Sequence, residues 1–584
     1  MNKKSSSVIE EKLNSALVSR QKNNFRDAEK LYREVLEADS KNFEATFSLG
    51  TIFLQHEKFD EAREFFLKAI LINPNHSNTY NNLGIAMKEL GQKEKSIVCF
   101  HKAIEIEPNH EMAHNNLGIA FKEKGDYKKA INSYKKAIEI NPDNFDSLNN
   151  LGTIYTELGE HEKSANYFNE AIKINPNNVT AHTNLLFNIC WLNKDIKYLE
   201  YAKRYYDIIS KHEISQTFTS NKVDKKSLKI GFVSGDFNNH PVTYFLLDTL
   251  KKLKKENIKL FAYNNNNKED KFTELLKKNF DHWHSISDKD DKDTIELIRK
   301  DNLDILFDLS GHTKRSRLGI FKSKCAPVQA TWSGWLASTG IKEIDYIIGD
   351  PYVTPYTDQK KFTEKIYQLE NIWQCLSISD FDPDVFSIKK NDNQSVVFGS
   401  FNNTIKLNDT VIKTWSKILN QVPDSKIFLK YGSFDITEVK NNIIEKFVGN
   451  GISKSRIITE GRSSRDEYLK CYNKIDIALD TFPINGGTTN FEASYMGVPI
   501  LTKISENNAW FRSGVSINKN LKMDDWIAEN EIDYVAKAVK FSENKKNLIN
   551  LKIELRNIAL KSFLFDSDKF SKVFYKMLLD IKKK

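Results

Sequence analysis

The residues of this sequence that most clearly suggest chemistry lie between Asp480 and Glu492, in the segment DTFPINGGTTNFE. The apolar run Ile475–Leu479 predicts a strand that ends just before Asp480, and the run GGTT at 486–489 then opens a predicted helix near Phe491. The first N–H groups of a helix have no partner inside the helix, and the helix dipole favours an anion there. With two threonine hydroxyls beside them, these groups predict a diphosphate cradle. A plain glycine-rich loop with threonine as the N-cap is the alternative.

Four other polar segments follow predicted strands: GFVSGDFNNHP (231–241), DLSGHT (308–313), WSGW (332–335) and GSFNNTIK (399–406). Lys406 could neutralise the same phosphates as a point charge, although a lone lysine is more often only solvated. Glu492 could accept hydrogen bonds from a ribose, or could be a carboxylate of a first helical turn. His240 and His312 could each act as an acid–base group or as a donor to an oxygen.

A loop histidine is more often structural or exposed, but two of them after successive strands of one lobe favour a function. The two histidines have no third ligand at a diagnostic spacing, so no metal site is expected.

The elements that would position these residues alternate between strands and helices, which predicts doubly wound parallel sheets. Two lobes are expected, at 226–390 and 391–584, and the second should end in helices. A ligand would bind between the lobes, at the carboxyl ends of the strands. The predicted strands are Leu228–Val233, Ile258–Tyr263, Leu303–Leu309, Tyr346–Ile348, Val396–Phe401, Ser425–Leu429, Arg456–Thr459, Ile475–Leu479 and Pro499–Leu501.

A 34-residue repeat precedes these lobes, with four copies in register at 43–76, 77–110, 111–144 and 145–178. Each copy carries Leu-Gly and ends in Asn-Pro or Glu-Pro. A period of 34 residues with these recurring residues is typical of tetratricopeptide repeats, which have two antiparallel helices per copy and a surface that binds peptides. Degenerate copies at each end extend the predicted superhelix to residues 9–212.

One feature of period 34 is not required by helix packing. Asn82, Asn116, Asn150 and Asn184 occupy the same phase of successive copies. An amide can donate and accept at once, so a ladder of asparagines could hold an extended peptide backbone whatever its side chains. The alternative is that asparagine merely suits this helix surface.

Composition limits the function classes. The chain has 584 residues and a net charge of +9, from 87 basic and 78 acidic residues. The lysines are spread over both regions without a nucleic-acid-binding signature, so nucleic acid is not an expected partner. The sequence shows no apolar run of membrane-spanning length and no secretory signal at its start. Five scattered cysteines, without CxxC spacing, fit reduced thiols and a cytoplasmic location.

The repeats together with GFVSGDFNNHP, DLSGHT, APVQATWSGW (326–335), SFNNTIK (400–406) and LDTFPINGGTTNFEASYMGVP (479–499) resemble the O-GlcNAc transferase and Spindly family of glycosyltransferases. The resemblance covers nearly the whole chain, with five motifs in the same order. It implies a two-lobed GT-B-type fold, without a metal or other cofactor. It also implies inverting transfer of a sugar from a nucleotide donor to serine or threonine of a protein.

The resemblance also implies roles for individual residues. The asparagine ladder matches the family's peptide-binding groove. The base that accepts the acceptor's proton could be His240, Asp308 or a phosphate oxygen. The remaining assignments are an active-site histidine at His240, a loop near the sugar at His312 and Thr313, a sugar-contacting turn at Gly334, diphosphate contacts at Lys406, Thr488 and Thr489, a place in the nucleotide-sugar site for Gly487, and base and ribose contacts at Asn403, Arg465 and Glu492.

The donor sugar is left open by this resemblance, because the chain departs from the animal enzymes. Gly487 stands in place of histidine, Glu492 of aspartate, Asn403 of glutamine, His312 of tyrosine and Leu336 of proline. Several of these changes resemble the plant Spindly branch, whose members use GDP-fucose. UDP-GlcNAc is the first expected donor and GDP-fucose the second. A non-catalytic scaffold, and a transferase acting on a glycan or lipid carrier, are further alternatives. Oligomeric state stays open.

Overall fold

The protein's structure is a computed structural model that describes residues 3–192, 198–211, 227–378, 385–387, 395–504 and 511–583. The chain divides into two compact units. One contains residues 1–154 with the short segments 173–175 and 436–438, and the other contains residues 155–172, 176–435 and 439–584. The last repeats therefore fold with the lobes, whereas the sequence predicted a change of domain near residue 212.

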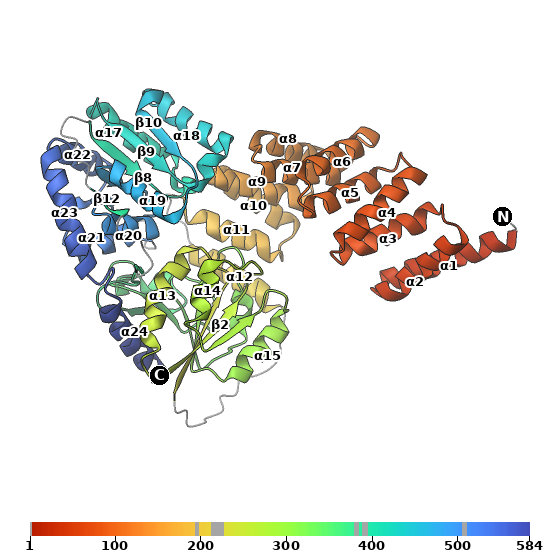
Figure 1. The fold of residues 1–584 in the computed structure, drawn as a ribbon, viewed down its shortest axis with the longest axis horizontal. Coiled ribbons are helices and arrows are strands. Elements are labelled where there is room, and N and C mark those ends of the chain that lie inside the picture. The colour runs from red at the N-terminus through yellow and green to blue at the C-terminus, as the bar shows by residue number, and fades with distance from the viewer. Residues whose placement is uncertain are drawn as a thin grey trace. The chain divides into compact units, whose positions relative to one another are not determined.

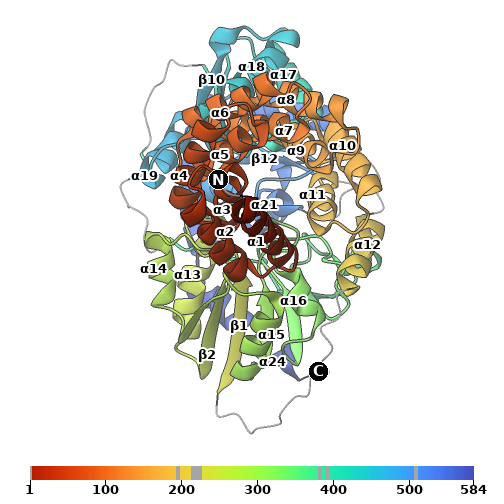
Figure 2. The ribbon, with the colours of Figure 1, turned by 90° about the vertical axis from the view of Figure 1, so that its right-hand side faces the viewer.

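The repeat region consists of consecutive helix pairs, which can be followed from red to yellow in Figures 1 and 2. Each predicted copy forms one pair, the degenerate copies at both ends included. The helices are α1 Lys3–Gln21, α2 Phe25–Ala38, α3 Phe43–Gln55, α4 Phe59–Ile72, α5 Ser77–Glu89, α6 Lys93–Ile106, α7 Glu111–Lys124, α8 Tyr127–Ile140, α9 Phe145–Glu157, α10 His161–Ile174, α11 Val179–Ile189 and α12 Tyr198–Ser210.

The glycine of each Leu-Gly pair lets the two helices of a repeat approach closely. A Cβ atom on Gly84 would lie 2.6 Å from the ring of Phe100, and one on Gly118 would lie 2.5 Å from the ring of Tyr134. Both rings are fully buried. An aromatic side chain thus fills the space that a glycine leaves, and this contact pairs the helices within these repeats.

The first lobe is built on a parallel sheet with the strand order β3-β2-β1-β4-β5-β6-β7. Its strands are β1 Leu228–Ser234, β2 Ile258–Asn264, β3 His282–Ser285, β4 Ile305–Asp308, β5 Val328–Thr331, β6 Tyr346–Gly349 and β7 Lys365–Gln368. The helices of this lobe are α13 Pro241–Leu253, α14 Lys271–Lys277, α15 Asp291–Asp301 and α16 Leu318–Lys322.

The second lobe repeats this plan with the strand order β10-β9-β8-β11-β12-β13, again parallel. Its strands are β8 Val397–Ser400, β9 Lys426–Lys430, β10 Ile457–Glu460, β11 Ile477–Leu479, β12 Ile500–Lys503 and β13 Ile527–Ala528. Its helices are α17 Asp409–Gln421, α18 Thr437–Gly449, α19 Arg465–Cys471, α20 Thr488–Tyr495, α21 Ser513–Asn520, α22 Glu531–Ser542, α23 Lys545–Lys561 and α24 Ser567–Lys582.

The predicted doubly wound architecture is confirmed, and every predicted strand overlaps an observed one. The strands β3, β5, β7 and β13 were not predicted. β3 is a short edge strand of sequence HWHS whose residues are exposed or half-buried, so it lacks an apolar pattern. β5 is fully buried but contains Gln329, whose side-chain amide donates to the carbonyl of Phe321 at 2.8 Å. A buried glutamine whose partner is a carbonyl of the helix α16 cannot be recognised from sequence alone.

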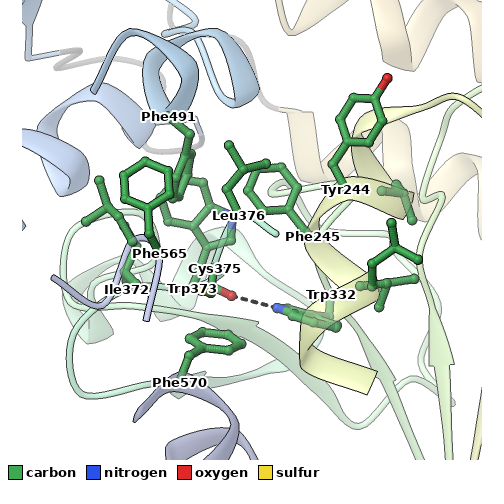
Figure 3. Close-up of a cluster of buried hydrophobic side chains, with 14 of the residues drawn as sticks. Tyr244, Phe245, Trp332, Ile372, Trp373, Cys375, Leu376, Phe491, Phe565 and Phe570 are labelled. Atoms are coloured by element: carbon green, nitrogen blue, oxygen red, sulfur yellow. Dashed lines mark hydrogen bonds between the residues drawn. The ribbon is translucent and has the colours of Figure 1, made fainter. Parts of the chain in front are cut away.

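An apolar cluster joins the two lobes (Figure 3). Phe245 of α13 contacts Phe491 of α20, with ring centroids 5.0 Å apart, and Trp373 contacts the same Phe491 ring at 5.7 Å. Trp332 donates from Nε1 to the carbonyl of Trp373 at 2.7 Å. Because α13 and α20 belong to different lobes, this cluster fixes the first turns of both helices relative to each other.

The C-terminal helix α24 returns to the first lobe, which the predicted boundary at residue 391 did not anticipate. Phe574 packs on Trp332 with ring centroids 4.5 Å apart, and Lys252 of α13 forms an ion pair with Asp568 at 2.6 Å. Further polar contacts join the lobes at α21, where Ser516 donates to Asp350 at 2.6 Å. The lobes are therefore held together on several sides of the interface.

Candidate active site

A cavity of about 270 Å³ lies between the two lobes, at the carboxyl ends of the strands. Its lining includes seven predicted site residues, His240, Gly334, Asn403, Lys406, Gly487, Thr488 and Thr489. These residues come from segments up to 250 positions apart, so only the packing of the lobes brings them together. The prediction that the polar segments at the strand ends share one cleft thus agrees with the positions of these seven residues.

The first turns of three helices contribute to this lining. Pro241 and Val242 begin α13, Thr488 and Thr489 begin α20, and Ser513 begins α21. The N-cap of α20 is Gly487, which has no side chain to cap the helix. Since the first N–H groups of a helix carry partial positive charge, the cavity favours an anion such as a diphosphate.

Lys406 supplies the cationic side chain of the cavity lining. It ends the short 3₁₀ turn Thr404–Lys406, and its Nζ donates to the carbonyl of Asn485 at 2.8 Å. Burial lowers the pKa of this ammonium to about 8, and the carboxylate of Asp480 opposes that shift. The same ammonium lies 6.0 Å from the ring centre of Trp191.

Asp480 organises the turn that carries the glycines and threonines. Its Oδ1 accepts from the backbone N–H of Gly486 at 2.6 Å, and its Oδ2 accepts from the hydroxyl of Thr502 at 2.7 Å. Burial raises the pKa of this carboxyl to about 6, while these donors and Lys406 favour the ionised form. Asp480 therefore holds the backbone of the turn that carries Gly486 and Gly487.

His240 lines the cavity as the N-cap of α13. Its Nδ1 accepts from the N–H of Val242 at 3.3 Å and lies 3.9 Å from Oδ2 of Asp236. The surrounding protein lowers the pKa of the ring, although 41% of the side chain stays exposed, and Asp236 opposes the shift. With Nδ1 as the acceptor, the neutral ring carries its proton on Nε2 and is a hydrogen-bond donor.

Asp308, His312 and Thr313 follow β4 as predicted, but they do not line this cavity. Asp308 accepts from the N–H groups of Ser310 and Gly311 and from the hydroxyl of Thr331, and burial raises its pKa to about 6. His312 is 1% exposed, donates from Nε2 to the carbonyl of Thr339 at 2.9 Å, and has its pKa lowered by burial to about 4.

These three residues shape the loop behind the cavity wall. The His312 ring packs edge-on against Tyr205 of α12 and against Trp335, with centroids 4.7 and 5.9 Å apart. Thr313 donates to the carbonyl of Ser310 at 2.9 Å. Sequence spacing placed the loop at the right strand end, but the direction of its side chains depends on α12, which is distant in sequence. Their catalytic and sugar-contacting roles stay predictions.

Arg465 and Glu492 form a buried ion pair, Nη1 to Oε1, at 2.5 Å, and neither lines the cavity. The guanidinium stacks on the ring of Tyr244 at 4.7 Å. The hydroxyl of Tyr472 bridges this pair to the cavity wall, with Oε2 of Glu492 at 3.3 Å and the carbonyl of Thr489 at 3.0 Å. Each of these residues is therefore paired with the other inside the protein. Their predicted contacts to the ribose and base of a nucleotide stay predictions.

Two of the in-phase asparagines donate hydrogen bonds to the preceding repeat. Asn116 donates to Oδ1 of Asn81 at 2.9 Å, and Asn150 donates to Oδ1 of Asn115 at 3.1 Å. Asn82 accepts from its neighbour Asn81 at 3.2 Å. A packing role between repeats therefore accounts for part of this pattern, and peptide binding stays a prediction for these residues. Asn184, the fourth in phase, is half-buried on α11 and belongs to the other unit.

Other cavity-lining residues were not predicted as site residues. Asn402 and Asn485 stand inside quoted motifs, and Oδ1 of Asn402 accepts from the hydroxyl of Thr489 at 3.2 Å. Trp191 and Ser513 belong to no motif of the lobes. Trp191 lies in the degenerate copy 179–212, where Leu186 stands in place of the glycine of the Leu-Gly pair, and this change was the signal in the sequence for a different packing partner.

Two negative findings apply to the described residues. Within the described ranges, no group of three or more His, Cys, Asp or Glu side chains could hold a metal ion. Over the same part of the chain, no helix combines the length and the apolar character needed to cross a membrane.

The model of glycosyl transferase family 41 matches residues 198–380 and 387–574, which is more than half of the chain. Tetratricopeptide-repeat models match, among others, residues 13–77 and 145–178. A relative from Solanum lycopersicum, named probable UDP-N-acetylglucosamine–peptide N-acetylglucosaminyltransferase SPINDLY, is 33% identical over 361 residues, which are 61% of this chain and 39% of the relative.

The UDP-N-acetylglucosamine–peptide N-acetylglucosaminyltransferase of Caenorhabditis elegans is 22% identical over 455 residues, covering 58% of this chain and 39% of that protein. The chain thus spans about two fifths of the length of these curated relatives. A solved structure of a Thermobaculum terrenum O-GlcNAc transferase mutant superimposes with a TM-score of 0.77 at 25% identity, covering 87% of this chain and 98% of that chain. The two-lobed fold and the preceding repeats are shared with that structure.

Proposed function

Because the chain belongs to glycosyl transferase family 41, we propose that it transfers a sugar from a nucleoside diphosphate donor to serine or threonine hydroxyls of proteins. One observation carries the proposal. Lys406 and the first turn of α20 line one cavity, with His240 in the same lining. The acceptor oxygen attacks the anomeric carbon with inversion, and the nucleoside diphosphate leaves with its bonding electrons.

The charge that develops on the leaving diphosphate is the electrostatic task of the site. The Lys406 ammonium and the helix N-termini are positive groups already in place for it, so the proposal needs no metal ion. Of the candidate bases within the protein, His240 lines the cavity, while Asp308 lies behind its wall with both oxygens occupied. A phosphate oxygen of the donor is the third candidate.

We propose UDP-GlcNAc as the donor, in line with the printed names of the relatives, and proteins bound by the repeat arm as acceptors. GDP-fucose is the second candidate. It is favoured by several of the chain's departures from the animal enzymes, which resemble the plant Spindly branch. A scaffold without catalysis would have no need of a half-buried lysine in this cavity, whose desolvation is costly.

The first test is the melting temperature of the whole chain with millimolar UDP, UDP-GlcNAc, GDP or GDP-fucose in EDTA, with ADP as the control nucleotide. A ligand that binds only the folded state must raise the melting temperature. We expect a shift with UDP and UDP-GlcNAc, followed by label transfer from UDP-GlcNAc to protein acceptors. A guanosine-only shift would replace the donor by GDP-fucose. No shift with any of the four would favour the scaffold or a donor outside this set.

The lowered pKa of Lys406 predicts how donor affinity depends on pH. The diphosphate binds the ammonium form, which is dominant below the free-site pKa of about 8 and is lost above it. Affinity for UDP should therefore fall about tenfold between about pH 7 and about pH 9, measured by calorimetric titration. The variant Lys406→Met should bind more weakly with a flat profile. An affinity in the native protein that does not change over this range would contradict the assignment.

A further inference from the structure

The last repeats contact the turn that carries Lys406, inside the same compact unit. We propose that His161, the first residue of α10, is a positioning residue that holds Lys406 in place through the carbonyl of Ile405. The assignment rests on the proposed function for its effect on catalysis, but its structural part can be tested without any donor. It gives the repeat arm a second task besides acceptor binding, since one of its helices supports the catalytic lysine.

The contact itself is a short hydrogen bond. Nε2 of His161 lies 2.7 Å from the carbonyl oxygen of Ile405, a residue 244 positions away in sequence. A carbonyl oxygen can only accept, so the imidazole donates from Nε2. Ile405 is the central residue of the turn Thr404–Lys406, directly before the lysine.

His161 is itself held firmly, as a positioning residue must be. It is 4% exposed, and its Nδ1 lies 3.0 Å from Oδ1 of Asn188 on α11, an oxygen that accepts from Nδ1 only when the ring is protonated on both nitrogens. Asn188 in turn donates to the backbone carbonyl of His161 at 2.9 Å and accepts from the hydroxyl of Thr156 at 3.2 Å. Buried hydrogen-bond networks of this kind restrict a side chain to one orientation.

Neighbouring backbone supports the same contact. Gly159 has a φ of +73°, and a Cβ atom there would meet the carbonyl oxygens of Leu407 at 3.6 Å and Ile405 at 3.8 Å. The side chain of Asn442 on α18 donates to the carbonyl of Leu158 at 3.4 Å. The segment before α10 therefore lies directly against the lysine turn.

Trp191 completes the link between the repeat and the cavity. Its ring stacks near that of His161, with centroids 6.0 Å apart and planes at 22°, and it lies 6.0 Å from Nζ of Lys406 on its cavity side. Two successive copies thus contact the lysine turn, one through the backbone before Lys406 and the other at its ammonium end. Because a catalytic group displaced by about 1 Å can lose about 100-fold in rate, small changes at His161 should reach the chemistry.

The test compares His161→Leu, which removes the donor, with His161→Gln, which keeps an amide donor of similar reach. His182→Leu is the matched control, because His182 is also buried, at 7% exposure, but its ring contacts the carbonyl of Pro176, just before its own helix α11. The first readout is hydrogen exchange of the amides of Lys406 and Leu407, which donate to the carbonyls of Asn403 and Thr404 at 2.9 Å. The second is the affinity for UDP and GDP, with kcat and KM wherever transfer is seen.

We expect exchange at 404–407 to rise about tenfold or more in His161→Leu and to stay near the native rate in His161→Gln and His182→Leu. Where the native chain transfers sugar, His161→Leu should lower kcat by about 10- to 100-fold with little change in the KM for acceptor, and His161→Gln should restore most of it. Should His161→Leu not fold, His161→Asn, whose amide is too short to reach Ile405, answers the same question.

Unchanged exchange at 404–407 in His161→Leu overturns the proposal, as does an equal rise in His182→Leu. A native chain that binds no nucleotide, but shows the expected exchange pattern, would overturn the proposed function and leave the positioning contact established. The two proposals therefore fail separately.

Discussion

Replacing Lys406 by methionine is expected to lower the rate of sugar transfer by about 10²- to 10³-fold, the usual effect of removing one preorganised charge from a transition state. Lys406 is the cationic side chain in the cavity lining, and its Nζ lies 2.8 Å from the carbonyl of Asn485, beside the turn that opens α20. Without this ammonium, charge on the leaving diphosphate is stabilised by the helix N-termini alone. Methionine has a similar length but no charge, so packing should be kept.

Stability should move in the opposite direction from activity. Burial lowers the pKa of Lys406, which means that the folded protein holds this charge at a cost. We therefore expect the melting temperature of Lys406→Met without ligand to be equal to or above that of the native chain, while stabilisation by UDP is largely lost. Steady-state transfer and thermal melting with and without UDP check both parts.

The matched control is Lys413→Met, because Lys413 is an exposed lysine of α17 in the same lobe. It should leave transfer and UDP stabilisation at native values. Native transfer rates in Lys406→Met would show that the diphosphate does not bind at this lysine, and the proposed site would then be wrong.

The second large effect is expected at Gly334, where alanine should destabilise the catalytic unit by about 3 kcal/mol or more and abolish donor binding. A Cβ atom there would lie 2.0 Å from the carbonyl oxygen of Leu309 and 3.5 Å from Cγ2 of Val242. The 2.0 Å contact involves backbone, which cannot swing aside, so the loops after β4 and β5 must separate. Both Gly334 and Val242 line the cavity, so this movement also changes the site.

Thermal melting and UDP titration of Gly334→Ala measure the two consequences. Gly449→Ala is the control, because a Cβ atom at that position of α18 meets nothing within 4 Å. A glycine within a helix stabilises the helix by about 1 kcal/mol less than alanine does, and Gly449 is the last residue of α18. This control should therefore leave the stability of the protein unchanged or raise it slightly. If Gly334→Ala melts and binds UDP like the native chain, the loops after β4 and β5 are free to relax, and their close contact has no role in the site.

The apolar cluster between the lobes explains why such backbone contacts matter. Phe245 and Phe491 lie on α13 and α20, close to His240 and to Thr488 and Thr489, so their contact sets the width of the cavity. A shift of either helix would separate the histidine from the diphosphate cradle. This spacing depends on aromatic packing that no motif of the cavity reveals.

Much of the fold followed from local patterns. The period of 34 predicts the helix pairs because each pair can bury its apolar face only on the next one. Alternating short apolar runs and helical segments predict two parallel sheets, because parallel strands need crossover helices between them. Short edge strands such as β3 escaped prediction, since they have no buried face to impose a pattern.

For the site, the sequence by itself determined the cradle, because Asp480, Gly487 and Thr488 belong to one strand–turn–helix segment whose geometry is local. It likewise placed Lys406 and His240 at strand ends. Only the tertiary structure decided which side chains face the cavity. His312 and Asp308 turn into the protein because α12 and the loop after β5 offer hydrogen-bond partners there. Glu492 forms an ion pair with Arg465, and His161 donates a hydrogen bond to the carbonyl of Ile405, 244 residues away in sequence. Such contacts arise only when elements distant in sequence pack together.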